Sequence, residues 1–192
     1  MEIREEKREI RKKILALRDG MGSDERKRAS LLLTERIAGH QWFYGSDYFL
    51  CFVSYGSEIS TLDIIEEALK SGRKVYVPKV HCGQGGAEMR FYGIASIREL
   101  EPGYRGIPEP AGGSEEYVYS DSAAERTLML MPGVAFDRYR GRLGYGRGFY
   151  DRYLADRPGL QQRTIAVGYR CQMVEKLPEE DTDIRPCQVI CL

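Results

Sequence analysis

The densest group of residues able to do chemistry lies between positions 141 and 154, in the order Gly-Arg-Leu-Gly-Tyr-Gly-Arg-Gly-Phe-Tyr-Asp-Arg-Tyr-Leu. Three glycines alternate at Gly144, Gly146 and Gly148, which leaves the backbone N–H groups of this stretch unobstructed. Such a turn can form an anion-binding nest, and a helix that begins near Phe149 adds the positive end of its dipole. The segment therefore predicts a site for phosphate.

Charged residues flank this glycine-rich turn. Arg142 and Arg147 can hold phosphate oxygens through bidentate hydrogen bonds. Asp151 follows within one turn, where it can hold a magnesium ion that bridges those oxygens. Taken alone, a glycine-rich loop after a strand is as often structural as phosphate-binding. It is no dinucleotide fingerprint, since its third glycine falls one position early, and no P-loop, since the Gly-Lys-Ser/Thr ending is missing.

Over a longer stretch the segment resembles the signature of the 5-formyltetrahydrofolate cyclo-ligase family (methenyltetrahydrofolate synthetase). That family carries a proline-glycine-x-alanine-phenylalanine-aspartate strand end, matched here by residues 132–137. An arginine-leucine-glycine-x-glycine-x-glycine run and an aromatic-tyrosine-aspartate ending follow, matched by residues 142–151. Shorter matches extend the resemblance over nearly the full length, at residues 7–11, 56–61, 77–79 and 107–110.

The resemblance implies a role for each part of the site. Lys7 and Arg11 are expected to contact the phosphates of ATP, and Asp151 and Asp183 to hold Mg²⁺. The loop is expected to wrap the nucleotide with Arg142, Leu143, Gly144, Tyr145, Gly146, Arg147, Gly148, Phe149 and Tyr150. The catalytic residues among these are expected to be Arg142, Arg147 and Tyr150. The folate is expected to meet Val53, Glu58, Tyr145, Gly146, Arg147, Gly148 and Phe149.

Without the resemblance, several of these residues have a simpler interpretation. Lys7 and Arg11 would be a solvated helix face. Glu58 would be a turn residue and Asp183 a loop charge. The sequence also departs from the family at two places. Arg147 stands where members commonly have glycine or lysine, and residues 187–192 lack the usual acidic ending.

The implied reaction converts 5-formyltetrahydrofolate and ATP into 5,10-methenyltetrahydrofolate, ADP and phosphate, with Mg²⁺ as cofactor. The formyl oxygen is a poor leaving group until it is phosphorylated, after which N10 can close the ring. The protein then has to position the substrates and neutralise charge, and needs no covalent nucleophile. Two alternatives stay open: another ATP-dependent kinase or ligase on the same scaffold, and a non-catalytic nucleotide- or folate-binding regulator.

Composition narrows the class of protein. Lysine plus arginine and aspartate plus glutamate each number 29 in 192 residues, so the net charge is zero, which argues against a protein whose main task is to coat nucleic acid. No stretch approaches the roughly 18 apolar residues that span a bilayer, and the charged N-terminus does not resemble a signal peptide. Five scattered cysteines are typical of a reducing compartment. We expect a cytoplasmic monomer that binds neither nucleic acid nor membrane.

Helical spacing of apolar residues predicts the first elements that position the site. A helix over residues 4–18 buries a narrow apolar stripe and is otherwise charged. A second helix follows an N-cap at Ser23, directs Leu32, Leu33 and Ile37 inward and ends near Gly39. A third is capped by Thr61.

Apolar runs predict the strands at residues 47–55, 74–80, 88–94, 127–131, 163–169 and 187–191. The second of these runs is expected to end at Pro78, and the third to be an antiparallel edge strand. Residues 100–120 are expected to form a long surface excursion. A strand, a helix and a strand within about thirty residues indicate a parallel sheet. The predicted fold is one three-layer α/β domain over residues 1–192, with a mostly parallel, Rossmann-like open sheet and helices on both faces.

Overall fold

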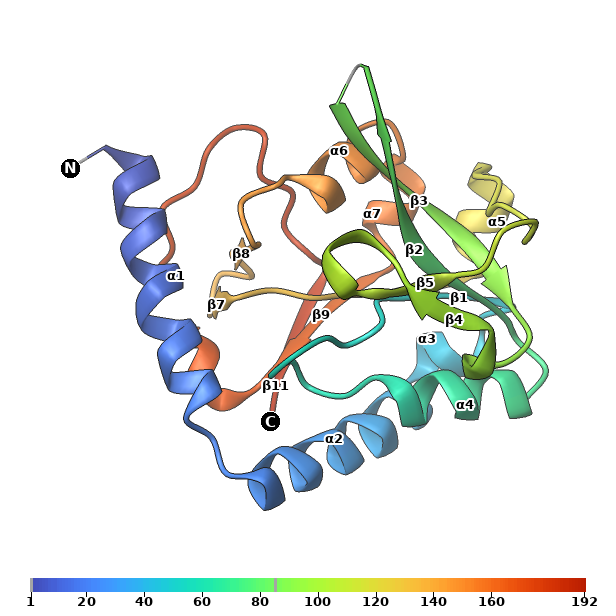
Figure 1. Cartoon of the computed structure of the whole chain (residues 1–192), viewed down its shortest axis with the longest axis horizontal. Coiled ribbons are helices and arrows are strands. Elements are labelled where there is room, and N and C mark those ends of the chain that lie inside the picture. The colour runs from blue at the N-terminus through green and yellow to red at the C-terminus, as the bar shows by residue number, and fades with distance from the viewer. Residues whose placement is uncertain (1, 85) are drawn as a thin grey trace.

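The computed structural model describes residues 2–84 and 86–192 (Figure 1). Within these residues the centre is a six-stranded sheet in the order β11-β9-β6-β1-β2-β3. Its strands are β1 (Tyr48–Cys51), β2 (Lys74–Gly83), β3 (Gly86–Ile94), β6 (Thr127–Met131), β9 (Thr164–Gly168) and β11 (Gln188–Cys191). Every neighbouring pair is parallel except β2 and β3, which are antiparallel. The predicted mostly parallel sheet with an antiparallel edge is confirmed.

Helices cover both faces of this sheet, as predicted. On one face lie α2 (Ser23–Ala38), α3 (Gln41–Tyr44) and α4 (Leu62–Lys70), and on the other α5 (Asp121–Glu125), α6 (Phe149–Ala155) and α7 (Pro158–Gln161). Successive strand residues alternate between the two cores, so Leu128 packs with the first set and Met129 with the second. Because both faces are covered, β6 and β9 are buried along their whole length.

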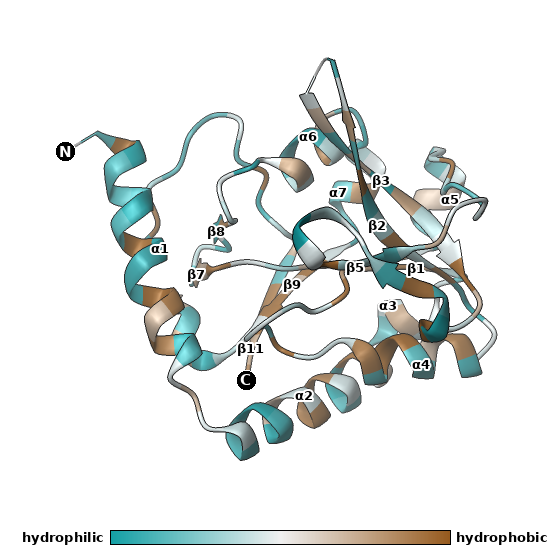
Figure 2. Ribbon diagram, viewed as in Figure 1, coloured by the Kyte–Doolittle hydropathy of each residue, from teal (hydrophilic) through white to brown (hydrophobic). Residues whose placement is uncertain are grey.

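Helix α1 (Ile3–Asp19) stands apart from these layers and packs on a small second sheet (Figure 1). That sheet has the order β10-β7-β8, with β7 (Ala135–Asp137), β8 (Arg142–Leu143) and β10 (Met173–Val174). Ile14 fills the joint core, and most of α1 is hydrophilic (Figure 2). Two of its buried side chains are nevertheless charged, Lys7 and Arg18. They face the site described below.

Three local predictions were wrong. Leu32 is 51% exposed, because the neighbouring Leu33 takes the inward position. Ser23 is the first residue of α2, whose N-cap is Gly22. Strand β2 continues beyond Pro78 to Gly83 because it pairs with β3 over this length, whereas β1 pairs only with residues 74–76. The proline nitrogen therefore faces an unpaired side of the strand, and no ladder hydrogen bond is lost.

Residues 100–120 are more ordered than a surface excursion. They contain a short hairpin of β4 (Leu100–Pro102) and β5 (Pro108–Pro110), joined by the turn η2 (Tyr104–Gly106). Glu109 and Tyr117 are both 6% exposed, because the segment folds back on the main sheet. The hairpin thereby becomes one wall of the site. In the described part of the chain no helix is long and apolar enough to cross a membrane.

Candidate active site

The glycine-rich turn is anchored by the aspartate that ends β7. Asp137 is buried, and its Oδ1 accepts hydrogen bonds from the backbone N–H groups of Tyr139 and Gly141, each at 2.8 Å. Its Oδ2 accepts from the N–H of Leu177, also at 2.8 Å. Asp137 therefore satisfies the backbone of the β7–β8 hairpin. This hairpin positions Arg142, the first residue of β8.

Arg142 and Asp151 form a buried ion pair at the centre of the site. Arg142 Nη2 donates to Asp151 Oδ1 at 2.7 Å, and their side chains are 3% and 20% exposed. The same Oδ1 accepts from the N–H of Ile184 at 3.1 Å. Asp151 lies in the first turn of α6, where the helix dipole favours a carboxylate. Arg142 Nε is buried and has no hydrogen-bond partner within the described residues.

A charged cavity of about 570 Å³ lies between α1, the glycine-rich turn and the segment around residue 183. Lys7 Nζ reaches Asp183 at 2.5 Å and Glu180 at 2.9 Å. Burial acts to lower the pKa of Lys7, but the hydrogen bonds and charges of the two carboxylates outweigh it and the pKa rises. Arg11 Nε donates to the carbonyl oxygen of Gly144 at 2.8 Å. Cations and carboxylates therefore line this cavity together.

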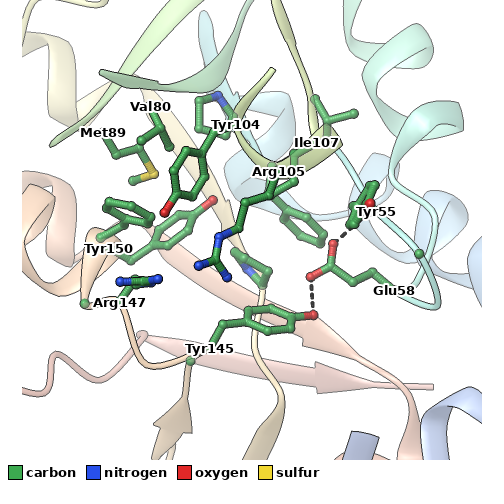
Figure 3. A pocket seen from close by; sticks show the side chains of 18 of the residues that line it. Tyr55, Glu58, Val80, Met89, Tyr104, Arg105, Ile107, Tyr145, Arg147 and Tyr150 are labelled. Carbon is green, nitrogen blue, oxygen red and sulfur yellow. Dashed lines mark hydrogen bonds between the residues drawn. The ribbon is translucent and has the colours of Figure 1, made fainter. Parts of the chain in front are cut away.

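A second, mainly apolar cavity of about 460 Å³ lies on the other side of the turn (Figure 3). One wall is the β4–β5 hairpin with Tyr104 and Arg105, and the opposite wall carries Tyr145 and Arg147. Arg105 has a φ of 56°, a left-handed conformation uncommon for a residue with a side chain. An apolar cavity with a few polar groups suits a flat heterocycle of the size of a pterin.

Glu58 is a carboxylate that lines the apolar cavity. Its Oε1 accepts from the Tyr145 hydroxyl at 2.5 Å, and its Oε2 accepts from the backbone N–H of Tyr55 at 2.9 Å (Figure 3). Burial raises the pKa of Glu58, and these hydrogen bonds together with the charge of Arg18 oppose the rise. Each oxygen keeps a lone pair for a further donor. The carboxylate can thus receive N–H groups of a ligand.

The two cavities meet at a shared wall, made by Arg142, Gly144, Gly148 and Asp151. The structure brings all the predicted site residues to one cavity or the other. The charged cavity also has Lys7, Arg11, Leu143, Gly146 and Asp183. The apolar cavity also has Val53, Glu58, Tyr145, Arg147, Phe149 and Tyr150. Residues more than a hundred positions apart in the chain therefore form one continuous site.

Sequence reasoning missed several residues of the site. Arg18 was assigned no function, yet it lines the apolar cavity and is 5% exposed. Tyr104 and Arg105 lie in a segment predicted to be a surface excursion. Glu180 had no motif to mark it, although it pairs with Lys7. The available signal for Arg18 was its spacing of seven residues from Arg11, which repeats after two helical turns.

The charged cavity fits a magnesium ion that is shared with phosphate. In residues 2–84 and 86–192 no three His, Cys, Asp or Glu side chains gather closely enough to hold a metal by themselves. Mg²⁺ needs no such set, because it usually takes one or two carboxylates and completes its shell with water and substrate phosphates. Asp151 and Asp183 line the same cavity as Lys7 and Arg11. This donor set suits Mg²⁺ bound together with a polyphosphate.

Comparison with known proteins decides the family. The sequence profile of the 5-formyltetrahydrofolate cyclo-ligase family matches residues 3–191. A probable 5-formyltetrahydrofolate cyclo-ligase of Caenorhabditis elegans is 30% identical over 98% of this chain and 93% of its own length. The chain belongs to the 5-formyltetrahydrofolate cyclo-ligase family. The enzyme of this name from Escherichia coli K12 is 33% identical over 69% of this chain and 71% of its own length.

Solved structures of the cyclo-ligase family agree with this assignment. The NMR structure of Aquifex aeolicus 5,10-methenyltetrahydrofolate synthetase is 32% identical and superposes with a TM-score of 0.78, covering 94% of this chain and 86% of that one. The synthetase of Mycoplasma pneumoniae, at 21% identity and a TM-score of 0.69, shares the fold. The predicted family, fold class and enzyme class, an ATP-dependent cyclo-ligase, are confirmed.

Proposed function

We propose that this chain binds ATP with Mg²⁺ in the charged cavity and 5-formyltetrahydrofolate in the apolar one. The phosphoryl group would pass from ATP to the folate at the wall that the two cavities share. The observation that carries the proposal is that Arg142, Gly144, Gly148 and Asp151 line both cavities. A phosphoryl group can pass directly between two substrates only if their sites touch. Here they touch at a buried arginine and at a turn rich in N–H donors.

In the charged cavity, Lys7 and Arg11 are assigned to the phosphates of ATP. Lys7 supplies a point charge and Arg11 a planar fork, and both are already turned toward the glycine-rich turn or the carboxylates beside it. The N–H groups around Gly144 and Gly146 can add further hydrogen bonds. Asp151 and Asp183 would hold Mg²⁺, which when bound neutralises phosphate charge. On binding, Lys7 and Arg142 would exchange these carboxylates for phosphate oxygens.

In the apolar cavity, the proposed ligand is the reduced pterin of the folate. Glu58 would accept hydrogen bonds from pterin N–H groups, since each of its oxygens has one acceptor position left. Val53 and Phe149 would contact the ring. Tyr150 lies beside Arg142, whose Cζ is 5.6 Å from the centre of the tyrosine ring. Burial raises the pKa of Tyr150, so its hydroxyl stays protonated and can donate a hydrogen bond to substrate oxygen.

The reaction follows from this placement. The formyl oxygen attacks the γ-phosphorus of ATP and the bond to the β,γ-bridging oxygen breaks, giving ADP and an iminium phosphate. N10 then attacks the formyl carbon and loses its proton, and the C–O bond breaks to release phosphate and 5,10-methenyltetrahydrofolate. Arg142 is assigned to the phosphoryl oxygens during transfer, because its buried guanidinium lies where the cavities meet. Arg147 is assigned to negative charge on the folate side of the turn.

The deciding experiment is a dropout assay with purified protein, followed by the absorbance of the methenyl product. Product is expected only when ATP, Mg²⁺ and 5-formyltetrahydrofolate are all present. Product without nucleotide would refute the proposal. ATP hydrolysis that does not depend on folate would favour another kinase or ligase, and binding of both substrates without turnover would favour a regulator. That the chain acts as a cytoplasmic monomer stays a prediction.

A further inference from the structure

Arg18 joins three separate segments around the apolar cavity. It projects from the last turn of α1, and its Nη1 donates to the Tyr145 hydroxyl at 2.7 Å. Its Nε donates to Ser57 Oγ at 2.9 Å, and Ser57 in turn donates to Asp19. Ser57 directly precedes Glu58 in the chain. Arg18 thus holds both the turn that carries Glu58 and the tyrosine that touches the Glu58 carboxylate.

The direction of these hydrogen bonds is fixed by chemistry. A guanidinium can only donate, so the Tyr145 oxygen must accept from Arg18. The tyrosine proton is then left for Glu58 Oε1, 2.5 Å away. Burial and the charge of Glu58 raise the pKa of Tyr145, which keeps that proton in place. A donor that is polarised by a cation is a stronger donor. The hydrogen-bonded chain from Arg18 through the Tyr145 hydroxyl to Glu58, here called the relay, therefore favours the ionised form of Glu58 in one orientation.

We propose that Arg18 is a positioning residue for folate binding, and that it acts through Tyr145 and Ser57 to hold Glu58 as an oriented carboxylate. The inference rests on the proposed function in that the ligand of Glu58 is the folate. The relay leaves one lone pair on each Glu58 oxygen. The Glu58 side chain is therefore held in one rotamer before substrate N–H groups bind to it, and less side-chain entropy is lost on binding.

The relay also connects Glu58 to the nucleotide side of the site. Tyr145 lies between Gly144, whose carbonyl accepts from Arg11, and Gly146, whose φ is +91°. The tyrosine side chain thus reaches the apolar cavity from a turn whose backbone borders the charged one. Its hydroxyl is the part that touches Glu58, so removing the hydroxyl alone tests the relay and leaves the turn in place.

The test measures the Kd of 5-formyltetrahydrofolate by calorimetry without ATP, from pH 5 to 8, for wild type and four variants. Tyr145→Phe is expected to raise the Kd at pH 7 about tenfold, the loss that corresponds to one hydrogen bond to a charged group. The pH below which binding weakens should also move upward, because Glu58 loses a group that favours its ionised form. Arg18→Met should act in the same direction, and Arg18→Lys, which keeps the charge, should restore part of the shift.

Tyr139→Phe is the matched control. Tyr139 is 46% exposed and Tyr145 is 47% exposed, and each hydroxyl lies within hydrogen-bond distance of an arginine. Tyr139 lies outside both cavities, and its variant should bind as wild type does. Other charged or titratable groups that line the cavity of Glu58 stay in place in every variant. These are Asp19, Arg105, Glu109, Arg142, Arg147, Tyr55, Tyr104, Tyr150 and Asp151.

The outcomes separate this inference from the proposed function. Wild type that does not turn over 5-formyltetrahydrofolate would refute the function itself. Active wild type, with a folded Tyr145→Phe variant whose Kd and pH dependence are unchanged, would refute only the role of the relay. Tighter binding by Tyr145→Phe would show that the tyrosine competes with the ligand, and would refute it as well. If Arg18→Met fails to fold, Tyr145→Phe decides the question. In steady-state assays the KM for folate should rise, and the KM for ATP should change much less.

Discussion

Replacing Asp151 by asparagine should destabilise the ligand-free protein more than the same change at Asp183. Asp151 is the carboxylate partner of Arg142, whose side chain is 3% exposed and whose Nε already lacks a partner within the described residues. The asparagine would keep an oxygen for Arg142 and for the Ile184 N–H but would lose the charge. Breaking a buried ion pair from one side costs about 3–5 kcal/mol. Because Asp151 is 20% exposed and a hydrogen bond survives, we expect the free energy of unfolding to fall by about 2 kcal/mol, which lowers the Tm by about 4–8 °C.

Asp183→Asn is the comparison that makes this prediction specific. When Asp183 loses its charge, Lys7 still has its ion pair with Glu180 at 2.9 Å. We therefore expect the free energy of unfolding to fall by less than about 1 kcal/mol. Thermal unfolding of both variants without ligand measures the difference. Adding a non-hydrolysable Mg-ATP analogue should then raise the Tm of wild type and raise that of both variants much less. Equal Tm losses without ligand would refute the reasoning about Arg142, and a full ligand-induced shift in both variants would refute the metal role.

Three further predictions follow from the structure. Arg147→Ala should raise the KM for folate about tenfold and the KM for ATP less, because Arg147 lines the apolar cavity; steady-state kinetics in which only the ATP KM moves would contradict this. Glu58→Gln should abolish folate binding yet not lower the Tm at pH 7. The pKa of Glu58 is raised in the folded state, so wild type loses free energy of unfolding as the pH rises above the pKa that Glu58 has in the unfolded chain. The variant has no group that ionises at this position and does not lose that free energy. Its Tm advantage over wild type should disappear below about pH 4. Gly133→Ala should lower the free energy of unfolding by about 1–3 kcal/mol in urea denaturation, because a Cβ there would lie 2.5 Å from the buried Phe136 ring. Gly112 has open space around it, so Gly112→Ala should change the free energy of unfolding little.

The sheet and its helices could be predicted from the sequence because their signals are local. Runs such as residues 127–131 are apolar throughout, and a strand covered on both faces requires that pattern. The errors arose where a tertiary neighbour decided the outcome. Pro78 is tolerated inside β2 because β1 has already ended beside it. Leu32 and Leu33 are chemically alike, and only the position of α2 on the sheet determines which of them is buried.

The residues of the site could be named from the sequence, but their partners could not. The glycine-rich turn, Lys7 and Glu58 belong to segments that resemble the family, and the same resemblance implied Asp183. Nothing in their spacing shows that Lys7 pairs with Glu180, or that Arg18 reaches Tyr145, because these contacts join residues more than a hundred positions apart. Arg147 illustrates the same limit. Its place between two glycines predicts a cation near an anion, and only the fold shows that it lies on the side of the apolar cavity.

The pairing of charges in the ligand-free site bears on how it can bind two highly charged partners. Lys7 and Arg142, which we propose bind phosphate, form ion pairs with Asp183 and Asp151, the residues assigned to Mg²⁺. ATP alone would bring its negative charge against these carboxylates, and Mg²⁺ alone would have to displace the cations. If both bound together, each cation would gain a phosphate oxygen and each carboxylate would become a metal ligand, so no buried charge would be left unpaired. On the proposed assignment the site would therefore favour the metal–nucleotide complex over either component, and this selectivity would come from the two ion pairs of the ligand-free protein.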